Sequence, residues 1–169
     1  QEKNDDEKQS KPNILIFYAD DLGYGDLSSY GGDIPTPNID QIGEMGIRFT
    51  NFYVSAPSCT PSRYSLLTGA YPQRSRGGLY DAIFRDDSDS LRNGEKILPE
   101  YFREQGYRTG IVGKWHQGGT PLAHGFERFA GFTQGCIDYF THVAQFPQIT
   151  TDYALDWNVG KQKVDTSGY

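Results

Sequence analysis

Apolar runs and helix-start signals alternate along the chain. Residues 14–18 (ILIFY) form a continuous apolar run, which is typical of a central strand buried on both faces. Thr36 and Pro37 form a helix-start pair, an N-cap residue followed by proline, and the predicted helix ends near Gly46. Residues 47–54 (IRFTNFYV) show an alternation of apolar and polar side chains and are rich in β-forming residues, so they predict a second strand.

The same alternation continues in the next part of the chain. Thr60 and Pro61 repeat the helix-start pair and predict a helix over residues 62–68. A further helix is predicted over residues 99–105, and residues 107–112 follow as a strand. Strands and helices in this order predict an α/β fold with a mostly parallel central sheet flanked by helices.

Composition narrows the classes of protein and partner. The 169 residues carry 16 basic and 22 acidic side chains, a formal net charge of −6, which argues against a nucleic-acid partner. The longest clean apolar run, residues 14–19, is too short to span a membrane. Residues 1–13 are nearly all polar and predict a flexible leader before the folded part, residues 14–169. The chain starts at Gln1 rather than Met, so we expect that any export signal has been removed.

Three polar clusters are expected to meet at one edge of the sheet. Open α/β sheets bind ligands beyond the carboxyl ends of their strands. Asp20 and Asp21 follow the first predicted strand, and Lys114 and His116 follow the last. Cys59 lies after the second strand and directly before a helix N-terminus. We therefore expect these side chains to converge on one crevice.

The paired carboxylates suggest a cation site. Asp20 and Asp21 are adjacent, and two such charges in a poorly solvated crevice are unfavourable unless a cation compensates them. Carboxylate oxygens suit Ca²⁺ or Mg²⁺. The alternative is a solvated turn that precedes Gly23.

Cys59 combines a nucleophile with an anion site. The thiolate is favoured next to a helix N-terminus, whose N–H groups also bind anions. Arg63 follows one turn later on the same side as Cys59 or Thr60, and its guanidinium matches a tetrahedral oxyanion. The alternatives are a buried structural cysteine or a disulfide with Cys136.

Lys114 and His116 supply a positive charge and a proton-transfer group. They are two residues apart, so in an extended segment both side chains project from one face. The alternative is a surface lysine and a histidine that only makes a structural hydrogen bond. His124 and His142 are expected to be structural.

Short motifs stand in one order along the chain, and the most specific is the C-x-P-x-R motif from Cys59 to Arg63. The others are residues 12–14 (PNI), 19–27 (ADDLGYGDL), 36–40 (TPNID), 46–53 (GIRFTNFY), 98–101 (LPEY) with 113–116 (GKWH), and 124–126 (HGF). By these blocks the chain resembles the N-terminal part of a type I, formylglycine-dependent sulfatase. These arylsulfatase-like enzymes belong to the alkaline phosphatase superfamily, so the resemblance implies a truncated α/β domain of that fold. It also implies a secreted or periplasmic location.

The resemblance implies a role for each candidate residue. Cys59 would be oxidised to formylglycine by a formylglycine-generating enzyme, and its hydrated aldehyde would attack the sulfur of the substrate. Asp20 and Asp21, together with the modified Cys59, would hold Ca²⁺, with Mg²⁺ as the alternative. Arg63 would hold the hydrate. Lys114 would contact the sulfate of a sulfated small molecule or polysaccharide, and His116 would hydrogen-bond the hydrate.

The chain departs from the family pattern at Gln117, where the family often has leucine, and we expect little consequence. The remaining metal ligands, a histidine and a lysine come from a later part of such enzymes. The leading hypothesis is a sulfuric ester hydrolase, acting on a carbohydrate. Two others stay open: a phosphonate or phosphate ester hydrolase of the same superfamily, and a non-catalytic fragment that binds an anionic ligand. The Gly- and Asp-rich residues 77–93 are expected to form a loop.

Overall fold

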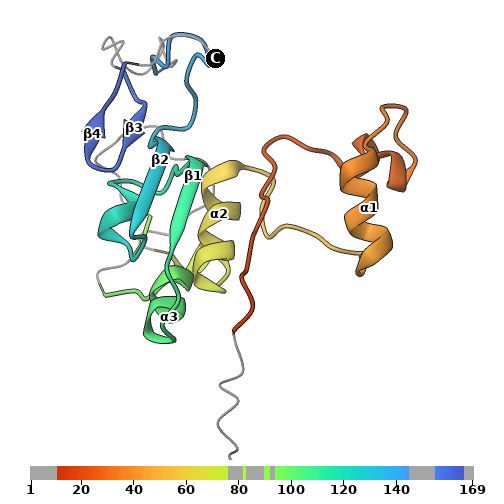
Figure 1. Cartoon of the computed structure of the whole chain (residues 1–169), viewed down its shortest axis with the longest axis horizontal. Helices are drawn as coiled ribbons and strands as arrows, with labels where there is room; N and C mark the ends of the chain where they lie inside the picture. The colour runs from red at the N-terminus through yellow and green to blue at the C-terminus, as the bar shows by residue number, and fades with distance from the viewer. Residues whose placement is uncertain (1–10, 76–81, 83–89, 92–93, 145–154, 166–169) are drawn as a thin grey trace, which may run out of the picture. The chain divides into compact units, whose positions relative to one another are not determined.

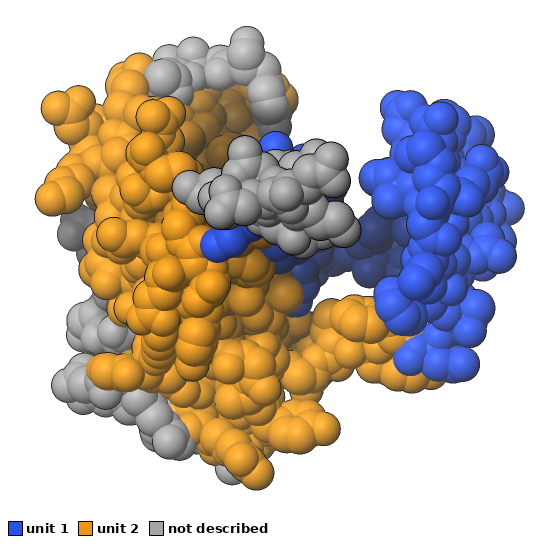
Figure 2. Space-filling model, turned by 60° about the horizontal axis from the view of Figure 1, so that its bottom comes forward, with its two compact units in different colours: residues 1–51 blue, residues 52–169 orange. Residues whose placement is uncertain are grey.

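The computed structural model describes residues 11–75, 82, 90–91, 94–144 and 155–165. Two compact units divide the chain, residues 1–51 and residues 52–169, and Figure 2 colours them separately. In the described stretches no helix is long and apolar enough to cross a bilayer. Most of the expected leader (1–13) and of the expected loop (77–93) lies outside the described residues.

The first unit contains the helix that the Thr36-Pro37 pair predicts. Helix α1 spans Pro37–Met45, and two short 3-10 turns precede it, at Tyr24–Asp26 and Ser28–Tyr30. Asp40 of the helix accepts hydrogen bonds from the Ser28 and Thr36 hydroxyls and from the Ser29 amide. These bonds, the Ser28 hydroxyl first, hold the pKa of Asp40 below its usual value.

The prediction of two strands in the first part of the chain is wrong. Residues 14–18 and 47–54 form no strand in the structure, and Leu15 and Phe17 are 77% and 80% exposed. A strand exists only through hydrogen bonds to a neighbouring strand. No segment among the described residues pairs with either stretch. The apolar pattern indicates that these residues suit a buried strand. It does not indicate which other segment would pair with them.

The second unit carries a four-stranded mixed sheet in the order β1-β2-β3-β4. Its strands are β1 (Gly110–Lys114), β2 (Arg128–Phe132), β3 (Asn158–Val159) and β4 (Gln162–Lys163). Strands β1 and β2 are parallel, and the other two pairs are antiparallel. Figure 1 shows β1 and β2 side by side, with α2 next to β1. Strands β3 and β4 form a hairpin after Trp157.

Strand β1 begins three residues later than the prediction over 107–112. The reason is the end of helix α3 (Leu98–Glu104), which the sequence predicts within one residue at each end. The Gly106 amide donates to the Arg103 carbonyl, and the Tyr107 amide donates to the Phe102 carbonyl. Tyr107 therefore closes the helix, as in other glycine-terminated helices, and pairing starts only afterwards.

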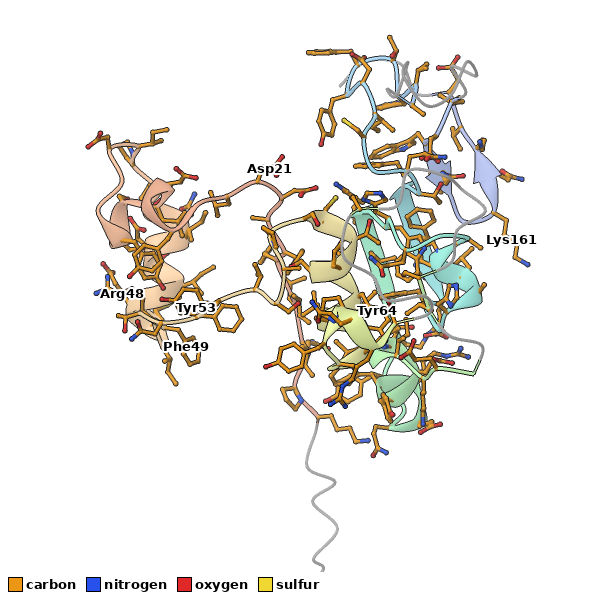
Figure 3. The ribbon with its side chains drawn as sticks, turned by 180° about the vertical axis from the view of Figure 1, so that it is seen from behind. Asp21, Arg48, Phe49, Tyr53, Tyr64 and Lys161 are labelled. Carbon is orange, nitrogen blue, oxygen red and sulfur yellow. The ribbon has the colours of Figure 1, made fainter. Side chains whose placement is uncertain are left out.

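A small core holds the helices to the sheet. Helix α2 (Cys59–Thr68) starts three residues before the prediction and ends, as expected, at Gly69, which has a φ of +70°. Tyr64 of α2 is fully buried and packs with Leu91, Ile97 and Trp115. Figure 3 labels Tyr64 among the side chains between the helices and the sheet, and its hydroxyl donates to Glu95.

The parallel pair of strands depends on a close approach between two glycines. Gly113 of β1 faces Gly131 of β2, and a Cβ added at Gly131 would lie 2.0 Å from the Gly113 carbonyl oxygen. Gly131 also has a φ of +153°, which L side chains rarely adopt. No larger residue fits without moving one strand.

Replacing Gly131 with alanine is expected to destabilise the second unit by about 1–3 kcal/mol, because the new methyl group forces the strands apart. Denaturant unfolding of the full-length protein measures this loss. Gly25→Ala is the control, since a Cβ there meets nothing within 4 Å. Equal stability of the two variants would contradict the close-approach argument.

Candidate functional site

Cys59 is the first residue of helix α2, in the unit that carries the sheet. The preceding Ser58 has extended backbone, and Pro61 lies in the first turn, where its missing N–H has no intrahelical partner to lose. Cys59 is half-buried and its thiol is free. Cys136 is also free and exposed, so the alternative of a disulfide between these cysteines is wrong for this structure.

The Cys59 thiol meets the imidazole of His116. The Cys59 Sγ lies 3.2 Å from the His116 Nδ1, within hydrogen-bond reach, with the donor set by the histidine tautomer. His116 is only 3% exposed and has a φ of +54°. Such left-handed backbone is uncommon outside glycine and persists where the surrounding structure enforces it. The contact joins the start of α2 to the segment that follows β1.

Arg63 makes a second link between the same two elements. Its Nη1 donates a 2.8 Å hydrogen bond to the carbonyl of Lys114, the last residue of β1. Because the strand ends at Lys114 and His116 has left-handed backbone, the alternation rule does not place their side chains on one face. Of the expected convergence, the structure brings together the Cys59 thiol and the His116 ring, and it joins Arg63 to the main chain of Lys114.

The loop after β2 shapes the space around the imidazole. A Cβ added at Gly135 would lie 2.5 Å from Cε1 and 2.7 Å from Nε2 of His116. The loop is fixed by Asp156, which is 3% exposed and accepts the amides of Thr133 (2.9 Å) and Gln134 (2.7 Å). The Thr133 carbonyl in turn accepts the His116 amide.

Sequence reasoning did not single out Gly135 or Asp156. Neither belongs to a motif, and the partners of Asp156 are 22 and 23 residues away along the chain. The expectation for the other two histidines agrees with the structure. His124 stacks on Trp115, and His142 stacks on Trp157.

Asp20 and Asp21 lie in the other unit, on exposed chain without helix or strand. Asp21 has a φ of +54°, and Figure 3 shows it at a bend of the chain. Adjacent, solvated carboxylates are the hard oxygen donors that Ca²⁺ and Mg²⁺ prefer. Within the described stretches, no group of three or more His, Cys, Asp or Glu side chains is placed to hold a metal. The pair therefore fits as part of a donor set, and its convergence with Cys59 stays a prediction.

Comparisons with known proteins agree on one family. The sulfatase family model matches residues 12–166. Arylsulfatase A of Bos taurus is 51% identical over 130 residues, which cover 72% of this chain and 25% of the relative. Arylsulfatase of Klebsiella aerogenes is 37% identical over 142 residues, covering 79% of this chain and 30% of the relative. The chain thus spans about a quarter of the length of such relatives.

Solved structures support the same assignment. The crystal structure of Ps i-CgsB aligns with a TM-score of 0.77 and 33% identity, covering 94% of this chain and 38% of that one. The PsFucS1 sulfatase from Pseudoalteromonas sp. aligns with a TM-score of 0.65 and 36% identity, over 79% and 28% of the two chains. These matches confirm the expected α/β class, of which the described sheet and helices are a part. The chain belongs to the sulfatase family.

Proposed function

We propose that the protein that contains this chain hydrolyses sulfate esters at a centre built around Cys59. The observation that carries the proposal is the 3.2 Å contact between Cys59 Sγ and His116 Nδ1, at the N-terminus of a helix that opens with C-x-P-x-R. Membership of the sulfatase family supports it. A bare thiol beside a histidine also suits other chemistry, so the motif and the contact have to be taken together.

Cys59 is proposed as the precursor of formylglycine, made by a formylglycine-generating enzyme. One hydroxyl of its hydrated aldehyde attacks sulfur, which breaks the ester S–O bond and releases the alcohol. The second hydroxyl then loses its proton, the aldehyde C=O bond re-forms, and the C–O bond to sulfate breaks, which releases sulfate. His116 Nδ1 lies within hydrogen-bond distance of the atom attached to the Cys59 Cβ. An imidazole at that place can donate a hydrogen bond to the group that replaces the thiol, or accept a proton from it.

Positive charge surrounds the same position. A sulfate ester gathers negative charge on its oxygens as it reacts, and preorganised positive groups stabilise that charge. The N-terminus of α2 contributes its dipole and its N–H groups. Arg63, one turn after Cys59 in the same helix, is oriented by its bond to the Lys114 carbonyl, and its guanidinium is proposed to bind the group at position 59. Lys114 is proposed to contact the sulfate.

Asp20 and Asp21, with the modified Cys59, are proposed to hold Ca²⁺, or Mg²⁺ in its place. When bound, the cation supplies positive charge that polarises the sulfate oxygens. The two aspartates contribute oxygen donors from consecutive positions, and the left-handed backbone of Asp21 turns the chain between them. The other ligands of the cation are proposed to come from residues outside this chain segment.

The substrate proposed is a sulfated carbohydrate handled outside the cytoplasm, in a secreted or periplasmic protein. One similar structure, 32% identical, is Ps i-CgsB in complex with k-i-k-neocarrahexaose. The same oxyanion chemistry also suits phosphate and phosphonate esters, so the leaving group has to be tested directly.

The test is turnover by the full-length protein, produced together with a formylglycine-generating enzyme. We expect 4-nitrophenyl sulfate to be hydrolysed faster than 4-nitrophenyl phosphate or phenylphosphonate. Cys59→Ala should lower kcat by at least about 1,000-fold, because the nucleophile is lost. Cys136→Ala is the matched control, an exposed free cysteine whose removal should leave kcat unchanged.

Two results would contradict the proposal. Faster turnover of the phosphate or phosphonate ester would assign the site to the related hydrolases. No turnover of any ester, with sulfate still bound in calorimetry, would indicate a non-catalytic anion-binding protein.

The aspartate pair makes a separate prediction about the metal. Dialysis against EGTA should abolish sulfatase activity, and Ca²⁺ should restore it. Asp21→Asn should weaken Ca²⁺ binding at least about tenfold in calorimetry, a change of about 1.4 kcal/mol, since a charged ligand is lost. Asp33→Asn serves as the control, an exposed aspartate of the same unit. Unchanged Ca²⁺ affinity in Asp21→Asn would exclude the pair as ligands.

A further inference from the structure

We propose that Gln117 is a positioning residue that sets the contact between the side chain at position 59 and His116. The inference rests on the proposed function, because it assigns a role in the same centre. It departs from the expectation that glutamine at this position has little consequence.

The Gln117 side chain connects the two elements that build the site. It is fully buried, and its Nε2 donates 2.8 Å hydrogen bonds to the carbonyls of Thr60 and His116. Its Oε1 accepts a 2.6 Å bond from the Ser90 hydroxyl. A planar amide has two N–H donors in fixed directions. Both are used here, one on the first turn of α2 and one on the segment after β1.

These two carbonyls are next to the reacting side chains. Thr60 follows Cys59 directly, and the second carbonyl belongs to His116 itself. One amide group therefore sets how far the backbone that carries Cys59 lies from the backbone that carries the imidazole. The side-chain contact of 3.2 Å spans that same separation.

The surroundings of the Gln117 amide are deeply buried. Thr60 is fully buried, His116 is 3% exposed and Ser90 is 2% exposed, so water does not replace a lost bond. The Gln117 main chain is fixed as well, because its carbonyl accepts the Ser90 amide at 3.1 Å. Groups this deeply buried keep their hydrogen bonds, since an unmade one is costly. An apolar residue at position 117 fills the space but does not link the carbonyls.

The test compares Gln117→Met, which keeps the length and volume, with Gln117→Leu, the residue that the family often has. Gln105→Met, an exposed glutamine at the end of α3, is the control. The first readout is a crystal structure of each full-length variant. We expect the side chain at position 59 and the His116 Nδ1 to separate beyond about 3.5 Å in both Gln117 variants.

The second readout is the kinetics of 4-nitrophenyl sulfate. We expect kcat to fall about 10- to 100-fold in Gln117→Met with KM unchanged, since small displacements of catalytic groups have effects of this size. In a His116→Ala background the same substitution should add almost nothing, because Gln117 acts through His116.

An unchanged separation between position 59 and His116 in the folded Gln117 variants would overturn the inference, as would full additivity with His116→Ala. The separation is measured without turnover, so it decides the role of Gln117 even if the wild-type protein hydrolyses no sulfate ester. That last result would count against the proposed function alone. Should Gln117→Met fail to fold, the Gln117→Leu structure makes the same decision.

Discussion

The site depends on one constraint, the need to satisfy polar groups buried where helix α2 meets the segment after β1. Thr60, His116 and Gln117 are all at most 3% exposed, and each carries backbone groups that have lost water. Leaving one such group without a partner costs about 1–3 kcal/mol. The Arg63 bond to Lys114 and the Gln117 bonds to Thr60 and His116 meet this need. The chain is thereby held in the arrangement that brings Cys59 to the imidazole.

Local charge and overall charge have opposite signs in this protein. The net charge of −6 describes the whole chain and argues only against broad anionic partners. Cys59 lies at a helix N-terminus, and Arg63 and Lys114 are the cations proposed for the same centre, so positive potential is proposed to act over the few ångströms that matter for a bound anion. A sulfate site is therefore compatible with an acidic protein. The aspartate pair, which is itself negative, joins such a site only with a cation.

The sequence predicted features whose cause is local. Helix α1 begins at the predicted Thr36-Pro37 pair, and all three helices end close to a predicted glycine, a signal that acts within a few residues. Cys59, Arg63, Lys114 and His116 stand in short motifs. The two strands at residues 14–18 and 47–54 were predicted wrongly, because strand formation needs a distant partner. Gly135, Asp156 and Gln117 were not recognised as parts of the site for the same reason. Their importance comes from His116, Thr133 and Thr60, which only the folded chain brings near.

The central claim is that the thiol of Cys59 is the precursor of the reacting group, and peptide mass spectrometry tests it most directly. The full-length protein is produced with an active formylglycine-generating enzyme and digested, and the peptide that contains Cys59 is compared with the one that contains Cys136. The account predicts the mass of formylglycine or its hydrate at position 59 and an ordinary cysteine at position 136. An unmodified thiol at position 59 under these conditions would contradict it.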